Sequence, residues 1–287
     1  MSCFFLQGLL LSIFAYRSQN LSFFSMFGRL HSIFVPVLIA VFFSISFAGE
    51  NSPYTLSWKV DVPFALLGAG SVSLGNYLYA NMEPPSGEPS KSRLLPWDKP
   101  FAGTRNHLAD NISNYSSLLI LFPFVLEISD FSTGNSDLNE MPVFFVMVLE
   151  TASIESGVNL MLRSTKLWPR PEIFDSRTDR SDGQEWGSFY SGHASAAFAV
   201  AVFSSMWFEK KHSSSPFVPW VWAGSLSAAS AVAALRVAAG KHYPTDVVVG
   251  ALAGSLSSLA VLKLHESPES SLTLAPQPGG FIFSVRF

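Results

Sequence analysis

The chain has 287 residues and a formal net charge of −3, with 48% apolar and only 14% charged residues. This balance is more apolar than that of a typical soluble enzyme and favours a membrane-associated protein. The small negative charge and the lack of a basic stripe argue against nucleic acid as a partner. The single cysteine, Cys3, offers no pair for a disulfide framework and no CxxC motif.

The N-terminal segment 1–48 has the pattern of a leader. From Met26 onward, a short positive region with Arg29 precedes the apolar stretch Ile33–Ile45 and a small-x-small pattern at residues 46–48. These are the three parts of a secretory signal peptide, and an uncleaved anchor helix is the alternative. We expect translation to begin at Met26 and the leader to deliver the body of the protein to or through a membrane.

Residues 49–264 predict one helical domain. Six segments have the length and apolar composition of helices: Pro63–Asn81, Ser116–Ile128, Met141–Leu162, His193–Trp207, Pro216–Val237 and Pro244–Leu264. Gly, Ser and Ala are frequent in the last three, which is typical of closely packed helices. We expect an all-α fold, an antiparallel bundle of about six helices embedded in a membrane. Some segments are shorter than the roughly 20 apolar residues of a span, and the third carries Glu150, Glu155 and Asn159. A soluble or peripheral bundle is therefore the alternative.

The C-terminal segment 265–287 has a different pattern. Phe281, Phe283 and Val285 alternate with their neighbours at a period of two, which predicts a short strand-like tail. We expect this tail to pack against the protein, and a contact with a partner is the alternative.

Charged and polar residues form three clusters beside the predicted helices. The clusters are Arg163, Lys166 and Arg170; Ser191, Gly192 and His193; and Arg236, His242 and Asp246. They lie after the third helix, at the start of the fourth, and between the end of the fifth and the start of the sixth. Because successive helices of an antiparallel bundle alternate in direction, all these positions lie at one end. The topology therefore predicts a single site.

The residue types in these clusters suit a tetrahedral oxyanion. Guanidinium groups make paired hydrogen bonds to phosphate oxygens, and the amides of Ser191 and Gly192 at a helix N-terminus add donors. A metal site at the same place is disfavoured because the cationic side chains would repel a metal ion. A serine hydrolase is disfavoured because the stretch lacks the Gly-x-Ser-x-Gly elbow. We expect phosphate binding with no metal and no cofactor.

The two histidines suggest a division of roles. With Asp246 orienting one ring nitrogen, His242 is expected to attack phosphorus, and His193 to act as the general acid for the leaving alcohol. The arginines would stabilise the charge that develops on the phosphoryl oxygens. This assignment predicts a bell-shaped dependence of rate on pH.

The three motifs resemble the superfamily of type 2 phosphatidic acid phosphatases, bacterial class A acid phosphatases and vanadium haloperoxidases. Its pattern is Lys-x6-Arg-Pro, Pro-Ser-Gly-His and Ser-Arg-x5-His-x3-Asp. The corresponding stretches here are Arg163-x6-Arg170-Pro171, Tyr190-Ser191-Gly192-His193 and Leu235-Arg236-x5-His242-x3-Asp246. The resemblance covers about residues 62–264. This chain departs from the pattern at Arg163, Tyr190 and Leu235, and Lys166 is an alternative to Arg163 as the first phosphate ligand.

The resemblance implies a metal-independent hydrolase of a phosphomonoester or pyrophosphate that works through a phosphohistidine intermediate. The apolar helices favour a lipid phosphate as substrate and membrane lipid as surroundings, with no protein partner identified. The alternatives are a soluble periplasmic non-specific acid phosphatase, a vanadium-dependent haloperoxidase and a non-catalytic membrane protein that binds lipid phosphates. The expected location is a bacterial-type cell envelope, in the inner membrane with the site facing the periplasm, or soluble in the periplasm as the alternative.

Overall fold

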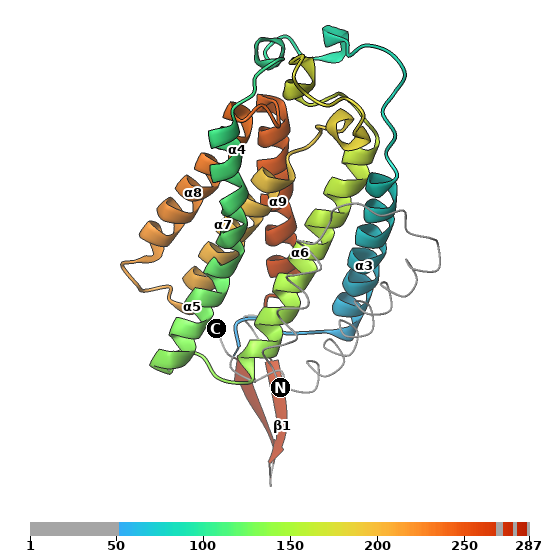
Figure 1. The fold of residues 1–287 in the computed structure, drawn as a ribbon. Coiled ribbons are helices and arrows are strands. Elements are labelled where there is room, and N and C mark those ends of the chain that lie inside the picture. Colours follow the sequence, from blue (N-terminus) through green and yellow to red (C-terminus); the bar gives the residue numbers. More distant parts are fainter. Residues whose placement is uncertain (1–51, 268–271, 278–279, 286–287) are drawn as a thin grey trace, which may run out of the picture. The chain divides into compact units, whose positions relative to one another are not determined.

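The computed structural model describes residues 52–267, 272–277 and 280–285, so the predicted leader lies outside the described residues. Five long helices are continuous: α3 (Trp58–Ala80), α6 (Glu140–Ser164), α7 (Gly192–Lys211), α8 (Val218–Ala238) and α9 (Pro244–His265) (Figure 1). A sixth rod joins α4 (His107–Asn114), the 3-10 helix Tyr115–Leu121 and α5 (Phe122–Thr133). The short 3-10 helices in the connections are Lys91–Arg93, Lys99–Phe101, Pro171–Phe174 and Gly183–Trp186. Within the described residues, the six predicted helical segments and the all-α bundle are confirmed.

Helix α7 is the centre of this bundle and packs against α5, α6, α8 and α9. Near its C-terminal end, Trp207 packs between aromatic rings, with its ring centroid 5.2 Å from that of Phe144 and 5.9 Å from that of Phe203. These three rings belong to a buried apolar core that also includes Tyr54, Val143, Met147, Val261 and Leu262. The core therefore fills the half of the bundle farther from the start of α7.

Glycines let α9 approach α7 closely near the start of α7. A Cβ at Gly254 would lie only 1.9 Å from the Ser195 carbonyl oxygen, and one at Gly250 would lie 2.6 Å from the Ser191 carbonyl oxygen. Such spacing of small residues is typical of tightly packed membrane helices. Because Ser191 belongs to the second predicted cluster and α9 begins within the third, this contact fixes the distance between the two clusters.

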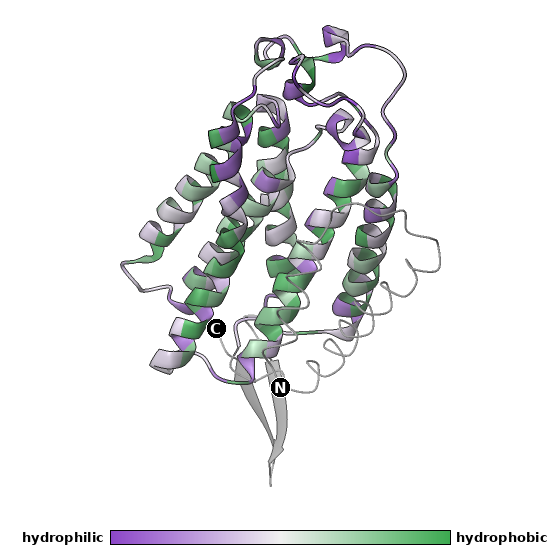
Figure 2. Cartoon of the chain, in the orientation of Figure 1, coloured by the Kyte–Doolittle hydropathy of each residue, from purple (hydrophilic) through white to green (hydrophobic). Residues whose placement is uncertain are grey.

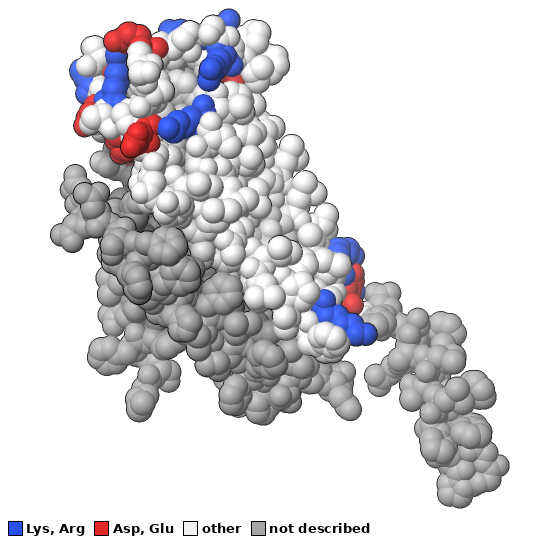
Figure 3. All heavy atoms as spheres, turned by 90° about the vertical axis from the view of Figure 1, so that its right-hand side faces the viewer, with Lys and Arg blue, Asp and Glu red and all other residues white. Residues whose placement is uncertain are grey.

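Four of the described helices are long and apolar enough to cross a membrane: His107–Thr133, Glu140–Ser164, Val218–Ala238 and Pro244–His265. Large apolar side chains remain exposed along α9, at Val248, Leu252, Leu256 and Leu259. Figure 2 shows apolar residues along the helices and polar residues mainly in the connections. On the face drawn in Figure 3, charged residues lie at the two ends and leave an uncharged belt between them. These features support membrane association.

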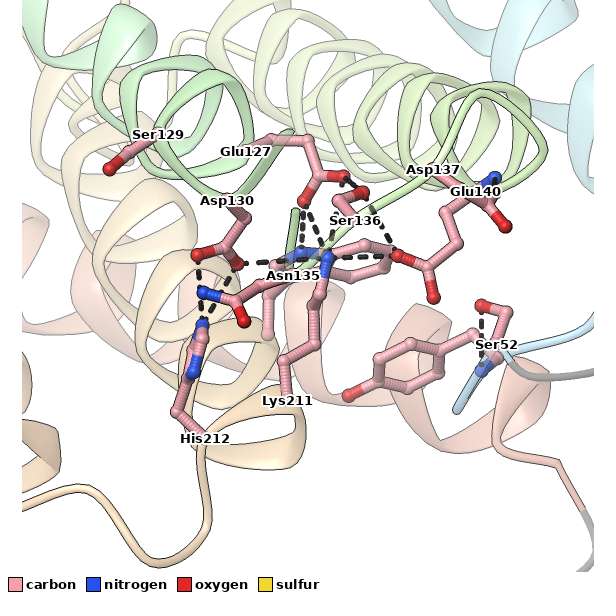
Figure 4. A network of polar contacts seen from close by, with 12 residues as sticks. Ser52, Glu127, Ser129, Asp130, Asn135, Ser136, Asp137, Glu140, Lys211 and His212 are labelled. Carbon is pink, nitrogen blue, oxygen red and sulfur yellow. Dashed lines mark hydrogen bonds and ion pairs between the residues drawn. The ribbon is translucent and has the colours of Figure 1, made fainter. Parts of the chain in front are cut away.

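A buried network of charges closes the end of the bundle where α7 finishes (Figure 4). Lys211 lies 2.9 Å from Glu140, 3.3 Å from Glu127 and 3.6 Å from Asp130. The Trp207 indole donates a hydrogen bond of 2.7 Å to Glu127. These bonds connect the last turn of α7 to α5 and α6. The positive charge of the buried Lys211 is balanced by the nearby carboxylates.

The C-terminal tail contains a β-hairpin. Strand β2 (Gly280–Val285) pairs antiparallel with β1 (Leu272–Gln277), with Leu272 opposite Val285. The strand predicted from the alternating residues is therefore confirmed. Its partner β1 was not predicted, because the short stretch LTLAPQ contains a proline and lacks clear alternation.

We predict that Gly254→Ala lowers the stability of the protein in detergent by about 1–3 kcal/mol, because the added methyl group must push the backbone of α7 away. The matched control is Gly224→Ala in α8, where a Cβ would meet no atom within 4 Å. This control should be neutral or stabilising by up to about 1 kcal/mol, since alanine favours helix. Thermal unfolding of both variants measures the difference, and equal stability would contradict the close α7–α9 contact.

Candidate active site

The loop at residues 187–191 connects the three predicted clusters. Arg163 Nε donates to the Gly187 carbonyl at 3.3 Å, and the Ser191 amide donates to the Asp246 carbonyl at 3.1 Å. The Ser188 carbonyl accepts a hydrogen bond of 2.9 Å from Nδ1 of His242. The ends of α6 and α8 and the starts of α7 and α9 lie at one end of the bundle, at the top of Figure 1. The structure therefore brings residues of all three clusters together.

His242 lies in the turn between α8 and α9 and is 1% exposed. Its Nδ1 hydrogen donates to the Ser188 carbonyl, whereas the nearest Asp246 oxygen is 3.7 Å from Nδ1. The direct bond from Asp246 that the sequence suggested is thus replaced by a backbone carbonyl. With the proton on Nδ1, the ring carries its lone pair on Nε2, as a nucleophile requires.

Asp246 connects the segments around His242. Its carboxylate accepts hydrogen bonds from the Trp168 indole at 3.0 Å, the Tyr243 amide at 2.9 Å and the Ser188 hydroxyl at 2.5 Å. The bond to Tyr243 closes the first turn of α9, where Pro244 occupies the first helical position. Asp246 therefore positions Ser188, and through the Ser188 carbonyl it positions the imidazole of His242.

Arg170 and Arg236 are each anchored through one nitrogen. Arg236 Nη1 donates to Asp110 at 3.0 Å, to Ser113 at 2.9 Å and to Asn114 at 3.3 Å. Arg170 Nη1 donates to Glu185 at 3.1 Å. The Nε atoms of both arginines are buried and have no hydrogen-bond partner among the described residues. An oxyanion would satisfy these unpaired donors, because Nε belongs to the edge of the guanidinium group that binds phosphate in a bidentate manner.

The other two cations of the first cluster have neighbours in and after α3. Arg163 contacts the hydroxyl of Tyr79, and its guanidinium carbon lies 4.4 Å from the centroid of the Tyr79 ring. Lys166 has a left-handed backbone, with φ of 51°, and its ammonium donates to the Glu83 carbonyl. The structure thus directs Lys166 toward the loop after α3, while Arg163 remains beside the 187–191 loop.

The N-terminus of α7 supplies backbone donors. The Ser191 hydroxyl caps the helix by accepting from the Ala194 amide at 3.4 Å, and the Ser191 amide is already used by Asp246. The amides of Gly192 and His193 are in the first turn and have no acceptor within the helix. A Cβ at Gly192 would lie 2.8 Å from Asn159 Oδ1, so glycine allows close packing here. The two backbone amides available to a ligand are therefore those of Gly192 and His193, whereas the sequence predicted those of Ser191 and Gly192.

Burial and positive charge keep both histidines neutral. The pKa of His193 is lowered to about 3 by burial first and then by Arg236, His242 and two further arginines. The pKa of His242 is held well below 6.5 by burial and by repulsion from Arg236 and Arg170. A bound oxyanion would oppose this repulsion and raise both pKa values.

Several residues that hold the cluster together were not among those predicted from the sequence. They are Asp110, Asn159, Trp168, Glu185 and Ser188. Asp110 and Arg236 are 126 positions apart, and Ser188 acts on His242 through its backbone carbonyl, which has no side-chain signature. Of these residues, only Asn159 stands out in the sequence, because it is a polar residue in an apolar helix. Its side-chain amide donates to the Tyr190 carbonyl at 2.8 Å.

We predict that sulfate binding at pH 5 is accompanied by proton uptake. Sulfate is a dianion that does not titrate at this pH, and His193 is neutral there because its pKa is about 3 in the free protein. The bound dianion raises that pKa, so His193 takes up a proton. Calorimetry in buffers of different ionisation enthalpy measures the uptake, which should fall in His193→Gln. Equal uptake by the variant and the wild type would contradict the assignment.

Comparison with known proteins supports the predicted resemblance. Residues 143–268 match the family model described as PAP2 superfamily. This range contains all three clusters and extends from α6 through α9. Searches among curated proteins and among solved structures give no match. The match confirms the resemblance that the three motifs indicate, over residues 143–268 of the chain.

Proposed function

We propose that the protein is a phosphatase that hydrolyses a phosphomonoester or pyrophosphate of a lipid through a phosphohistidine intermediate at His242. The PAP2 superfamily match implies phosphatase-type activity. The observation that carries the finer proposal is the pair of buried Nε donors of Arg170 and Arg236 without a partner among the described residues. They lie at the same end of the bundle as the imidazole of His242, whose lone pair is on Nε2 because Nδ1 donates to Ser188. Together they offer anion binding and a nucleophile at one place.

In the first step, the phosphoryl group binds to the free edges of Arg170 and Arg236 and to the first amides of α7, with Arg163 adding positive charge. Nε2 of His242 attacks phosphorus, so that a P–N bond forms as the bond to the leaving oxygen breaks. His193 gives its proton to that oxygen. The ring of His242 becomes positively charged, and this charge is stabilised by the Ser188 carbonyl and by Asp246 at 3.7 Å.

In the second step, water replaces the leaving alcohol. His193 accepts a proton from the water, whose oxygen attacks phosphorus and breaks the P–N bond. Inorganic phosphate then leaves, and both histidines return to their starting states. The arginines favour both transition states, because charge on the phosphoryl oxygens is largest there. The proposed cycle uses no metal ion at this site.

The apolar surface supports a lipid substrate. The exposed leucines and valine of α9 and the uncharged belt in Figure 3 favour insertion in a bilayer. An apolar groove of about 380 Å³ lies between the rod that ends in α5 and the helices α7 and α8, lined by residues such as Leu119, Phe122 and Trp220. Such a groove beside the helices that carry His193 and Arg236 would accommodate an apolar tail.

We propose that the site faces the periplasm, or the equivalent outer side of the membrane. The residues that follow the leader lie at the end of the bundle opposite the site, since the Thr55 amide donates to the His265 carbonyl, so the proposed orientation rests on the charge distribution and not on the leader. Lys210 and Lys211 lie at the opposite end of the bundle from the phosphate-binding residues, which agrees with the positive-inside rule.

We expect the detergent-solubilised protein to release phosphate from at least one of four lipids: phosphatidate, phosphatidylglycerophosphate, an isoprenyl pyrophosphate or a lipid A phosphate. No added divalent cation should be needed. His242→Ala removes the nucleophile and should lower kcat at least about a thousandfold. The control His212→Gln changes a histidine at the far end, which is bonded to Asp130 at 2.9 Å, and should retain activity.

The same assay on sealed right-side-out vesicles tests the orientation. A water-soluble phosphate ester that does not cross the membrane should be hydrolysed without detergent. Near-normal turnover by His242→Ala, or a strict need for an added divalent ion, would contradict the mechanism. Hydrolysis only after the vesicles are opened would contradict the orientation alone.

A further inference from the structure

We propose that Asp61, Glu150 and His265 form a second site, which binds a divalent transition metal ion. The three side chains come from α3, α6 and α9, and their ligand atoms all lie within 4.8 Å of one another. His265 ends α9, whereas His242 and Asp246 lie around its start. At 1.5 Å per residue, the length of α9 separates the two sites by about 30 Å. The proposed metal site is thus distinct from the phosphate-binding residues.

The hydrogen bond at Nδ1 of His265 fixes which nitrogen faces the cluster. Nδ1 donates to the Val261 carbonyl at 2.7 Å, so the neutral ring carries its lone pair on Nε2. Nε2 lies 2.7 Å from Asp61 Oδ1 and 3.3 Å from Glu150 Oε2. The 2.7 Å contact to Asp61 is short enough for a hydrogen bond, so Nε2 shares either a proton or a metal ion with the two carboxylates. A backbone carbonyl bonded to the other nitrogen is the usual support of a metal-binding histidine.

The carboxylates also lack other partners. Asp61 is 0% and Glu150 is 3% exposed, so neither oxygen pair is well solvated. Asp61 Oδ2 and both oxygens of Glu150 have no hydrogen-bond partner among the described residues. Burying charged oxygens in this way is unfavourable unless a cation compensates them. Two carboxylates, a neutral imidazole and a divalent cation would together be neutral.

The donor set favours zinc over magnesium. One imidazole nitrogen and two carboxylate oxygens are common zinc ligands with bond lengths of about 2.0–2.2 Å, which places the donors about 3.3 Å apart around a tetrahedral ion. The distance from Nε2 to Glu150 already has this value, and the distance to Asp61 needs only a small increase. Magnesium prefers octahedral oxygen ligands and retains its water, which the burial of this site opposes.

The position of the cluster indicates a structural role. Asp61 lies in the first turn of α3, a helix outside the matched region 143–268, whereas Glu150 and His265 lie within that region. The segment before α3 already contacts the end of α9, since the Thr55 amide donates to the His265 carbonyl at 2.8 Å. A metal ion here would join α3 to the superfamily helices α6 and α9.

The test uses the full-length protein, washed with chelator, titrated with zinc chloride and then freed of excess metal. Elemental analysis should find about one zinc per chain, and thermal unfolding should shift upward by several degrees, with a smaller effect of magnesium. Glu150→Gln keeps the size of the side chain and removes its charge, so zinc affinity should fall at least about tenfold. The matched control is Glu155→Gln, which changes another buried carboxylate of α6 outside the cluster and should bind zinc as the wild type does.

Absence of stoichiometric zinc in the wild type, or wild-type affinity in Glu150→Gln, would overturn the proposal and leave a shared proton as the compensating charge. If Glu150→Gln does not fold, the wild-type protein still decides, because a thermal shift that zinc and magnesium produce equally would also overturn it. Phosphate release by the His242 site is a separate readout, so failure of one proposal does not imply failure of the other.

Discussion

Repulsion among buried guanidinium groups at one end of the bundle is the constraint on which the site depends. Arg170 and Arg236 bind different carboxylates, Glu185 and Asp110, and each arginine uses only its Nη1 for this bond. These bonds connect α4 and the loop before α7 to the site. Burial first, and then repulsion from these arginines, lowers the pKa of both histidines and keeps them neutral. The unpaired Nε donors of Arg170 and Arg236 make an anion the natural ligand.

A membrane setting is consistent with where the polar groups lie. The uncharged belt in Figure 3 separates two polar ends, and α7 takes part in both of them. At one end its first turn offers amides to a ligand, and at the other Lys211 is buried among carboxylates (Figure 4). The glycines of α9 let the central helix pack closely along this length. The proposed site and the buried charge network therefore lie at opposite ends of the same helices.

The sequence could predict the parts of the structure that follow from local pattern. Apolar runs gave five of the helices to within five residues but missed α4, because the stretch His107–Asn114 is polar. The alternation of helix direction brought Arg170, Arg236 and His242 to one end. It could not predict that the Ser188 carbonyl binds His242, because any residue has a carbonyl. It also could not predict the direction of Lys166, whose left-handed backbone turns the side chain toward Glu83. The pairing of Asp110 with Arg236 joins segments with no shared motif.

The most direct measurement is a structure of the protein with bound orthovanadate, an analogue of the phosphoryl group. We expect vanadium to be bonded to Nε2 of His242, with the Nε atoms of Arg170 and Arg236 donating to its oxygens. Vanadate bound elsewhere, or bound at the bundle end while both Nε atoms point away from it, would contradict the account.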